Sequence, residues 1–225
     1  MKKRDREFFL TVAVFGSYVF VRQLLLYLPI EFPSTRFVDG NWNWSGKLYV
    51  IGGSILFLVI YRKLGLKDYF LTARQNHTFS KKLMIKGIKT ILILMAISVG
   101  GLMLLTDPKS WDLESVMFQL SMPGIDEEIA FRGIMIGLLV KILKPDVRIF
   151  SLAIGNPAII ISAILFGLAH GFHLTNSMEP VFNLIPFMTS FAVGTIWGWL
   201  TVKSGSVLLA LFSHNLGNTL SVLIP

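Results

Sequence analysis

Two adjacent glutamates and an arginine interrupt an otherwise apolar stretch of the sequence. Glu127 and Glu128 follow Asp126, and Arg132 comes four residues after Glu128. Residues four apart share one face of a helix, so Arg132 can pair with Glu128, whereas Glu127 is rotated away from Glu128 by about 100°. We therefore expect Glu127, which has no cation near it in the sequence, to point into a cavity. A buried ion cluster that only fixes helix packing is the simpler alternative.

Two histidines and an asparagine add polar groups to later apolar stretches. His170 lies four residues after Phe166, and His214 lies four residues before Asn218. Each of them alone would indicate an interfacial residue or a hydrogen bond between helices. An ionisable residue inside a membrane span costs about 2.5–3.5 kcal/mol, so such residues usually serve a site or a structural pair. Polar groups of complementary type in three stretches favour one shared, hydrated reaction site.

These groups match the needs of peptide-bond hydrolysis, which are an activated water and donors for a developing oxyanion. Glu127 in a poorly hydrated cavity would act as the base, with His170 helping to hold the water. His214 and Asn218 could present N–H donors to the tetrahedral intermediate. Glu128 and Arg132 would then orient the helix that carries Glu127.

A metal-dependent version of the same chemistry is equally open on the sequence. Glu127, His170 and His214 would supply three ligands and leave a fourth position for water, as catalytic zinc sites do. The chain has no cysteine and no H-E-x-x-H motif, which excludes thiolate ligands and the common zincin arrangement. No serine lies in a G-x-S-x-G motif, and the predicted spans contain one aspartate, so serine and aspartyl mechanisms fit less well.

The elements that must position these groups are apolar segments. Of the 225 residues, 53% are hydrophobic and 15% are charged, well under the roughly 25% of a soluble domain. Seven apolar segments run approximately over Phe8–Pro29, Trp44–Tyr61, Ile88–Leu105, Val116–Leu139, Ala158–Phe172, Val181–Leu200 and Ser206–Ile224. The pattern predicts an all-α, polytopic transmembrane bundle in one membrane domain over residues 1–225. It has about seven spans, or eight if one segment is re-entrant or split.

Lysine and arginine are distributed unevenly between the two sides of this predicted bundle. With the N-terminus in the cytoplasm, sixteen lie on the inner side and three, namely Arg36, Lys47 and Lys109, lie on the outer side. This asymmetry follows the positive-inside rule. The net charge of +8 therefore indicates anionic membrane lipids as partners and not nucleic acid. The short lysine-rich loops favour a bacterial cell membrane.

The spaced polar residues resemble the motifs of the CPBP family, the CAAX proteases and bacteriocin-processing membrane peptidases, also called the Abi family. The E-E-x-x-x-R motif falls on Glu127, Glu128 and Arg132, the F-x-x-x-H motif on Phe166 and His170, and the H-x-x-x-N motif on His214 and Asn218. Three motifs in the family's order are far more specific than any one of them. A CPBP-like catalytic core would span residues 116–224.

The resemblance implies an intramembrane endopeptidase of the type II CAAX prenyl endopeptidase kind, with Glu127 as the catalytic glutamate. Its substrate would be a peptide or a prenylated or otherwise membrane-associated protein. Bacterial relatives act in bacteriocin maturation or self-immunity. Two other classes stay open. One is a non-catalytic immunity protein that sequesters a membrane-active peptide in the same cavity. The other is an ion-coupled transporter, which the lack of internal repeats disfavours.

Overall fold

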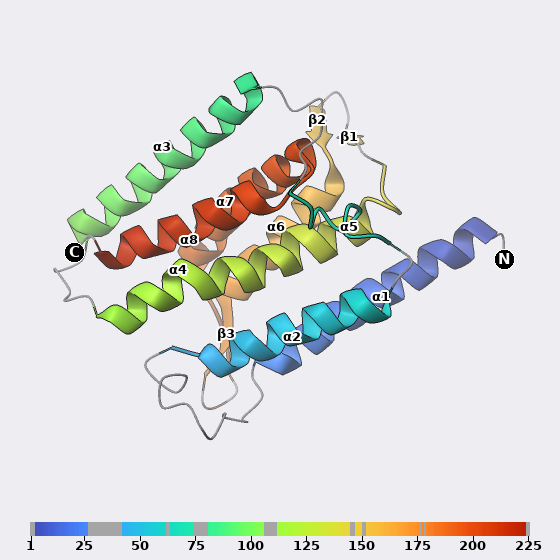
Figure 1. Ribbon diagram of the computed structural model, residues 1–225, viewed down its shortest axis with the longest axis horizontal. Coiled ribbons are helices and arrows are strands. Elements are labelled where there is room, and N and C mark those ends of the chain that lie inside the picture. Colours follow the sequence, from blue (N-terminus) through green and yellow to red (C-terminus); the bar gives the residue numbers. More distant parts are fainter. Residues whose placement is uncertain are drawn as a thin grey trace.

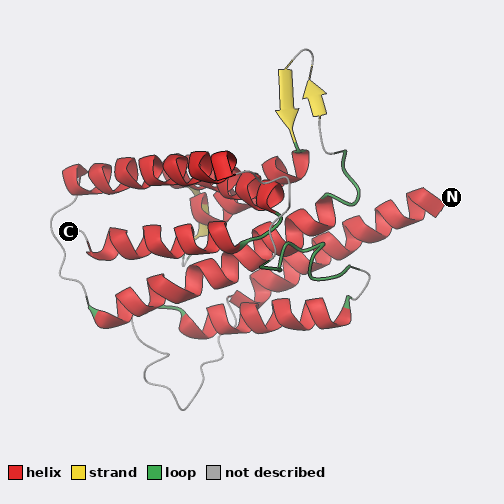
Figure 2. Ribbon diagram, turned by 45° about the horizontal axis from the view of Figure 1, so that its top comes forward, coloured by secondary structure: helices red, strands yellow, loops and turns green. Residues whose placement is uncertain are grey.

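The computed structural model describes residues 3–26, 42–61, 64–73, 81–105, 112–144, 147–149, 152–175, 177 and 179–223. Most of this part of the chain is helical, which confirms the predicted all-α class (Figures 1 and 2). The helices are α1 (Lys3–Leu26), α2 (Trp44–Ile60), α3 (Lys81–Leu105), α4 (Leu113–Glu127), the π-helix η1 (Glu128–Met135), α5 (Ile136–Leu139), α6 (Pro157–Gly171), α7 (Leu184–Ser204) and α8 (Leu208–Leu223). Two short antiparallel hairpins pair β1 (Val147–Ile149) with β2 (Leu152–Gly155) and β3 (Phe172–Leu174) with β4 (Pro180–Phe182).

The helices coincide with the seven predicted apolar segments, with their ends shifted by a few residues. The largest shift is at α3, which begins at Lys81 and not at Ile88, so exposed lysines such as Lys82 and Lys86 lie in its first turns. By length and composition alone, two stretches, Asp5–Leu26 and Leu184–Ser204, could cross a membrane, while α2 and α6 are apolar but shorter. The number of spans therefore stays a prediction.

Large apolar side chains cover the outside of the molecule. Phe20 on α1, Ile60 on α2, Ile97 on α3 and Ile185 on α7 are each exposed by more than 60%. A large exposed apolar surface is energetically unfavourable in water but normal for a protein surrounded by lipid. The exterior is therefore consistent with a membrane protein.

The helix formed by α4, η1 and α5 lies in the middle of the bundle. It packs against α2 on one side and against α8 on the other, while α1 pairs with α2 and α6 pairs with α7 (Figure 1). The helix α3 lies at an edge and contacts α7 and α8. The central helix carries the glutamates, so side chains from several neighbouring helices can reach them.

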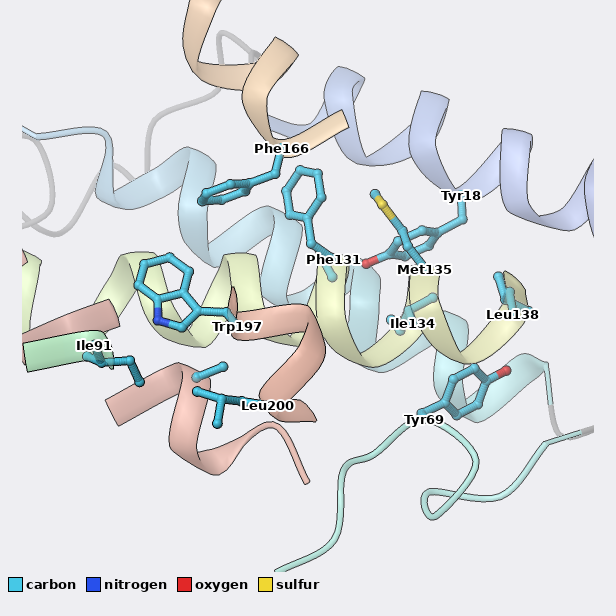
Figure 3. Close-up of a cluster of buried hydrophobic side chains, with 12 residues drawn as sticks. Tyr18, Tyr69, Ile91, Phe131, Ile134, Met135, Leu138, Phe166, Trp197 and Leu200 are labelled. Carbon is cyan, nitrogen blue, oxygen red and sulfur yellow. The ribbon is translucent and has the colours of Figure 1, made fainter. Parts of the chain in front are cut away.

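A buried aromatic cluster joins the central helix to α6 and α7 (Figure 3). The rings of Phe131 and Phe166 meet edge to face with centroids 5.2 Å apart, and Trp197 meets Phe166 in the same way at 6.1 Å. Such edge-to-face contacts add to the stabilisation from burial. They hold η1, α6 and α7 together beside the motif residues Arg132 and His170.

Proline interrupts α4 one turn before the glutamates. Pro123 has no N–H to donate, and its ring disturbs the preceding turn of the helix. The next residue, Gly124, donates its N–H to Asn215 Oδ1 of α8 at 2.7 Å, and Asn215 Nδ2 donates to the Ser121 carbonyl at 3.3 Å. A Cβ on Gly124 would collide with the Asn215 amide. The Pro-Gly pair thus lets α8 approach α4 closely enough to hold its disturbed turn.

The helix continues beyond Glu127 as a π-helix, where the sequence predicted an uninterrupted α-helix. The stretch Glu128–Met135 has the wider π-helical turn, a feature that is frequent at functional sites. Glu128 and Arg132 still pair as the sequence predicted, with Arg132 Nη1 3.2 Å from Glu128 Oε1. The change from α to π falls between the two glutamates.

The start of α2 is fixed by an asparagine cap. Asn43 Oδ1 accepts the Gly46 N–H at 2.8 Å, and Asn43 Nδ2 donates to the Leu26 carbonyl at the end of α1 at 3.1 Å. An asparagine at this position satisfies one of the free N–H groups of a helix start. These bonds join α1 to α2 and place Lys47, in the first turns of α2, against α4.

Candidate active site

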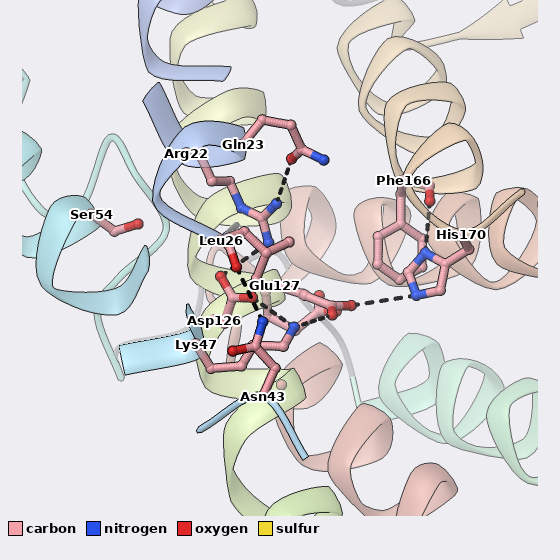
Figure 4. A network of polar contacts seen from close by, with 12 residues as sticks. Arg22, Gln23, Leu26, Asn43, Lys47, Ser54, Asp126, Glu127, Phe166 and His170 are labelled. Atoms are coloured by element: carbon pink, nitrogen blue, oxygen red, sulfur yellow. Dashed lines mark hydrogen bonds and ion pairs between the residues drawn. The ribbon is translucent and has the colours of Figure 1, made fainter. Parts of the chain in front are cut away.

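Glu127 ends α4 and has two carboxylate oxygens in different surroundings (Figure 4). Its Oε1 accepts a hydrogen bond from Lys47 Nζ at 2.5 Å. Its Oε2 is buried without a hydrogen-bond partner in the described structure, 3.7 Å from His170 Nε2 and 3.8 Å from His214 Nε2. One oxygen is therefore neutralised by a cation, and the other faces two imidazole nitrogens.

His170 lies in the last turn of α6, and its ring is oriented by the helix itself. Its Nδ1 lies 2.8 Å from the carbonyl oxygen of Phe166, four residues earlier. A carbonyl can only accept, so Nδ1 carries the proton and neutral His170 presents a lone pair at Nε2. The Phe166 ring also contacts the imidazole with centroids 4.4 Å apart. The F-x-x-x-H spacing thus sets both the position and the tautomer of His170.

His214 on α8 is oriented by the second glutamate. Its Nδ1 lies 2.8 Å from Glu128 Oε1, and its ring stacks on Trp197 at 4.4 Å with an angle of 19°. Glu128 is ionised in its pair with Arg132, so its oxygen accepts a hydrogen bond from the Nδ1–H of His214. Neutral His214 then has a lone pair at Nε2. A carboxylate behind an imidazole fixes the orientation and the tautomer of the ring.

Arg132 is fully buried behind the two histidines. Its guanidinium carbon lies 4.0 Å from the ring centroid of Phe166 and 5.3 Å from that of Trp197. A guanidinium over aromatic faces gains a cation–π attraction, which is strongest in places without water. Arg132 therefore binds Glu128 and also supports the rings against which both histidines pack.

A cavity of about 560 Å³ opens onto Glu127. Of the residues that the sequence singled out, five line it, namely Glu127, Phe166, His170, His214 and Asn218. The motif residues, spread over more than ninety positions of the chain, thus meet in one place. Glu128 and Arg132 are buried and are not among the residues that line the cavity.

The structure gives Glu127 a cation that no local pattern in the sequence indicated. Lys47, which lies in α2 within the predicted segment Trp44–Tyr61, binds both Glu127 and Asp126 through Nζ. Arg22 of α1 in turn binds both carboxylate oxygens of Asp126, at 3.0 and 2.9 Å. The one available signal was that Arg22 and Asp126 both fell inside predicted spans, where each would need a partner.

The charged groups of the site form one buried ion cluster. Its members are Arg22, Lys47, Asp126, Glu127, Glu128 and Arg132. Three cations balance three carboxylates, so the cluster is neutral when both histidines are neutral. A balanced cluster is far less costly to bury than one with an unpaired charge.

The sequence left a metal site at Glu127, His170 and His214 open. Within the described residues, no group of three or more His, Cys, Asp or Glu side chains is arranged to hold a metal ion. The two Nε2 lone pairs suit a metal in type, but the Lys47 ammonium on Glu127 already balances that carboxylate and would repel a divalent cation. The residues present therefore fit a bound water better than a metal.

Comparison with known proteins identifies the family. No curated protein and no solved structure matches the chain. Residues 109–220, about half of the chain, match the family model described as type II CAAX prenyl endopeptidase Rce1-like. The matched segment contains α4 to α7 and most of α8, and with them all three motifs. The chain is therefore a member of the Rce1-like type II CAAX prenyl endopeptidase family, a family of membrane-embedded proteases.

Proposed function

We propose that this protein is an intramembrane endopeptidase that hydrolyses a peptide bond with a water activated by Glu127 and the two histidines. The observation that carries the proposal is the buried, unpartnered Oε2 of Glu127, which faces His170 Nε2 and His214 Nε2 in the 560 Å³ cavity. A water among these three acceptors can donate hydrogen bonds to two of them and keep a lone pair for attack.

The reaction would proceed by direct attack of this water on the scissile carbonyl. The water oxygen forms a bond to the carbonyl carbon, the π electron pair moves to the carbonyl oxygen, and one water proton passes to Glu127 Oε2. When the tetrahedral intermediate collapses, the pair on oxygen re-forms C=O and the C–N bond breaks. The leaving nitrogen keeps that bond's electron pair and takes the proton from Glu127, so the glutamate ends as it began.

The two histidines would accept protons from the water, but they would not donate hydrogen bonds to the oxyanion. In the neutral state, both have their proton on Nδ1 and bound to a fixed acceptor, so Nε2 can accept a proton from water and cannot donate one. His214 is the better placed of the two for this, because Glu128 stabilises the imidazolium that would form. This changes the role that the sequence suggested for His214, which was a donor to the oxyanion.

Substrate class and setting follow from the family and extend the proposal. The substrate would be a prenylated or otherwise membrane-associated peptide cleaved in the type II CAAX manner, and a role in bacteriocin maturation or self-immunity is the biological setting we favour. The chain would lie in a bacterial cell membrane as a seven-span bundle with the N-terminus in the cytoplasm. Zinc is the alternative cofactor, and it predicts loss of activity on chelation.

The test is peptide cleavage by purified protein in liposomes, read by mass spectrometry with a farnesylated CAAX peptide and its unmodified counterpart. Glu127→Gln keeps the shape of the side chain but removes the base, and we expect a rate loss of about 10²–10⁴-fold. Lys203→Met, a change on the exposed end of α7, is the matched control. Cleavage by Glu127→Gln at the control rate would contradict the proposal, and so would absence of cleavage of both peptides by the wild type.

A second arm separates catalysis from sequestration. Cells that express wild type or Glu127→Gln at equal membrane levels are challenged with a membrane-active bacteriocin peptide. Protection by both proteins would favour the non-catalytic immunity protein, since a cavity that only binds does not need the base. Protection by the wild type alone supports the peptidase.

Peptide cleavage that survives a chelator would argue against zinc.

A further inference from the structure

Among the described residues on the wall of the cavity, Lys47 is the one charged donor whose chemistry the proposed mechanism has not used. Its side chain is largely buried, and Nζ donates to Asp126 Oδ2 at 2.7 Å and to Glu127 Oε1 at 2.5 Å. An ammonium has three N–H groups. The described contacts use two, and Lys47 lines the same cavity as Glu127 and both histidines.

The reaction needs a donor that the histidines do not provide. Charge develops on the carbonyl oxygen in the transition state, and a fixed N–H aimed at it is usually the largest single contribution to catalysis. The Nδ1 protons of His170 and His214 are held by the Phe166 carbonyl and by Glu128. Of the described donors that line the cavity, Lys47 is a charged one in contact with Glu127 itself, and Asn218 offers a neutral amide.

We infer that Lys47 is a catalytic residue that donates its remaining N–H to the oxygen of the scissile carbonyl, beside the amide of Asn218. This inference rests on the proposed peptidase function. The attacking water of the proposed mechanism would lie at Oε2 of Glu127, and the ammonium lies at Oε1, so a carbonyl placed over the carboxylate would have its carbon near that water and its oxygen near Lys47. A full positive charge stabilises the oxyanion more strongly than a neutral amide does.

Asp126 and Arg22 act in this arrangement as positioning residues for Lys47. Asp126 accepts one N–H of Lys47 and both contacts of Arg22 Nη2, so Asp126 ties the ammonium to α1 (Figure 4). The charge of Lys47 is retained because two carboxylates face it. A donor that is held before substrate binds needs little rearrangement during the reaction.

The test must distinguish two roles of Lys47, which are hydrogen-bond donation to the oxyanion and neutralisation of the buried carboxylates. Lys47→Met alone does not distinguish them, because it also leaves one carboxylate without a balancing charge. The double variant Lys47→Met/Asp126→Asn removes one charge of each sign and restores the balance of the buried ion cluster. Lys203→Met is the control for a lysine-to-methionine change outside the site. The measurements are kcat and KM for the farnesylated peptide in liposomes, and thermal unfolding in detergent micelles.

We expect Lys47→Met to lower kcat by about 10²–10³-fold with little change in KM, the loss typical of a missing oxyanion donor. In the double variant, kcat should stay low although the net charge of the buried ion cluster is again zero. If Lys47→Met does not accumulate in membranes, the double variant carries the test alone.

Two results would overturn the inference. Recovery of kcat in the double variant would mean that Lys47 only balances charge. A raised KM with unchanged kcat in Lys47→Met would mean that Lys47 binds the substrate equally in the ground and transition states. Both results leave the peptidase function standing, because that function fails only if Glu127→Gln cleaves normally or the wild type does not cleave.

Discussion

The two halves of the chain bring opposite charges to the buried ion cluster. The C-terminal half, which matches the family model over residues 109–220, supplies all three carboxylates but a single arginine. The helices α1 and α2, outside the matched segment, supply Arg22 and Lys47. Because an unbalanced buried charge is costly, the half that carries the motifs depends on the other half for a stable active site.

The difference also lies in how far apart the partners are in the sequence. Arg132 reaches Glu128 from one turn away, whereas Lys47 reaches Glu127 across eighty positions. The local pair sits behind the cavity and orients His214. The distant pair sits on the cavity wall and contacts the base itself. Breaking each pair in turn would show which half of the molecule limits stability and which limits chemistry.

The largest stability loss should come from Arg132→Met, which strands Glu128 in the interior. Removing one partner of a buried ion pair typically costs about 3–5 kcal/mol. We expect a lower midpoint of thermal unfolding in detergent and less protein in membranes. The double variant Glu128→Gln/Arg132→Met should recover much of this loss. Equal stability of Arg132→Met and wild type would contradict the role assigned to this pair.

A smaller loss is expected from Arg22→Met in the N-terminal half. Asp126 then keeps Lys47 as a partner, so the cost should be that of lost charged hydrogen bonds, about 1.5–3 kcal/mol. Lys47 would also be free to move toward Asp126 and away from Glu127, so kcat should fall more than KM rises. An Arg22→Met protein with normal kcat would show that this half contributes stability only.

Asn215→Leu tests the support of α4 without touching any charge. The change removes the acceptor of the Gly124 N–H at the proline break, and a buried donor without a partner costs about 1–3 kcal/mol. Hydrogen exchange should show faster opening around residues 120–126 than in wild type. Asn218→Leu, on the same helix but facing the cavity, serves as the contrast and should affect kcat and not this exchange.

The smallest effect is expected from Lys141→Ala, at a surface ion pair far from the cluster. Lys141 and Asp68 are both exposed, so the change in stability should stay within about 1 kcal/mol. The hydrogen bond from Lys141, with that from the Gly65 N–H, holds the pKa of Asp68 below its usual value. That contribution is present above the unfolded pKa of Asp68 and is lost as the pH falls through the folded pKa. The difference between variant and wild type should therefore vanish in acid, as thermal unfolding at two pH values would show.

Much of the helical architecture follows from the sequence, because apolar length and polar breaks are local signals. Helices occur in all seven predicted segments, and α6 begins at Pro157, directly after Asn156, whose side chain accepts the Ala158 N–H. The π-helical turn after Glu127 was not predictable in this way. Gly133 of η1 and Gly137 of α5 lie close to the backbone of Tyr69 and Asp68, and such contacts between segments far apart in the chain are absent from any local pattern.

The candidate site likewise has features that the sequence predicts and features that only the tertiary structure decides. Spacing by four, together with three motifs, was enough to select Glu127, His170, His214 and Asn218, because such pairs share a helix face wherever the helix lies. The tautomers of the histidines, the unpartnered oxygen of Glu127 and the cation on its other oxygen come from contacts between helices far apart in the chain. Charge neutrality in the interior is a property of all the helices together, so only the tertiary structure could assign Lys47 to the base and not to the membrane surface.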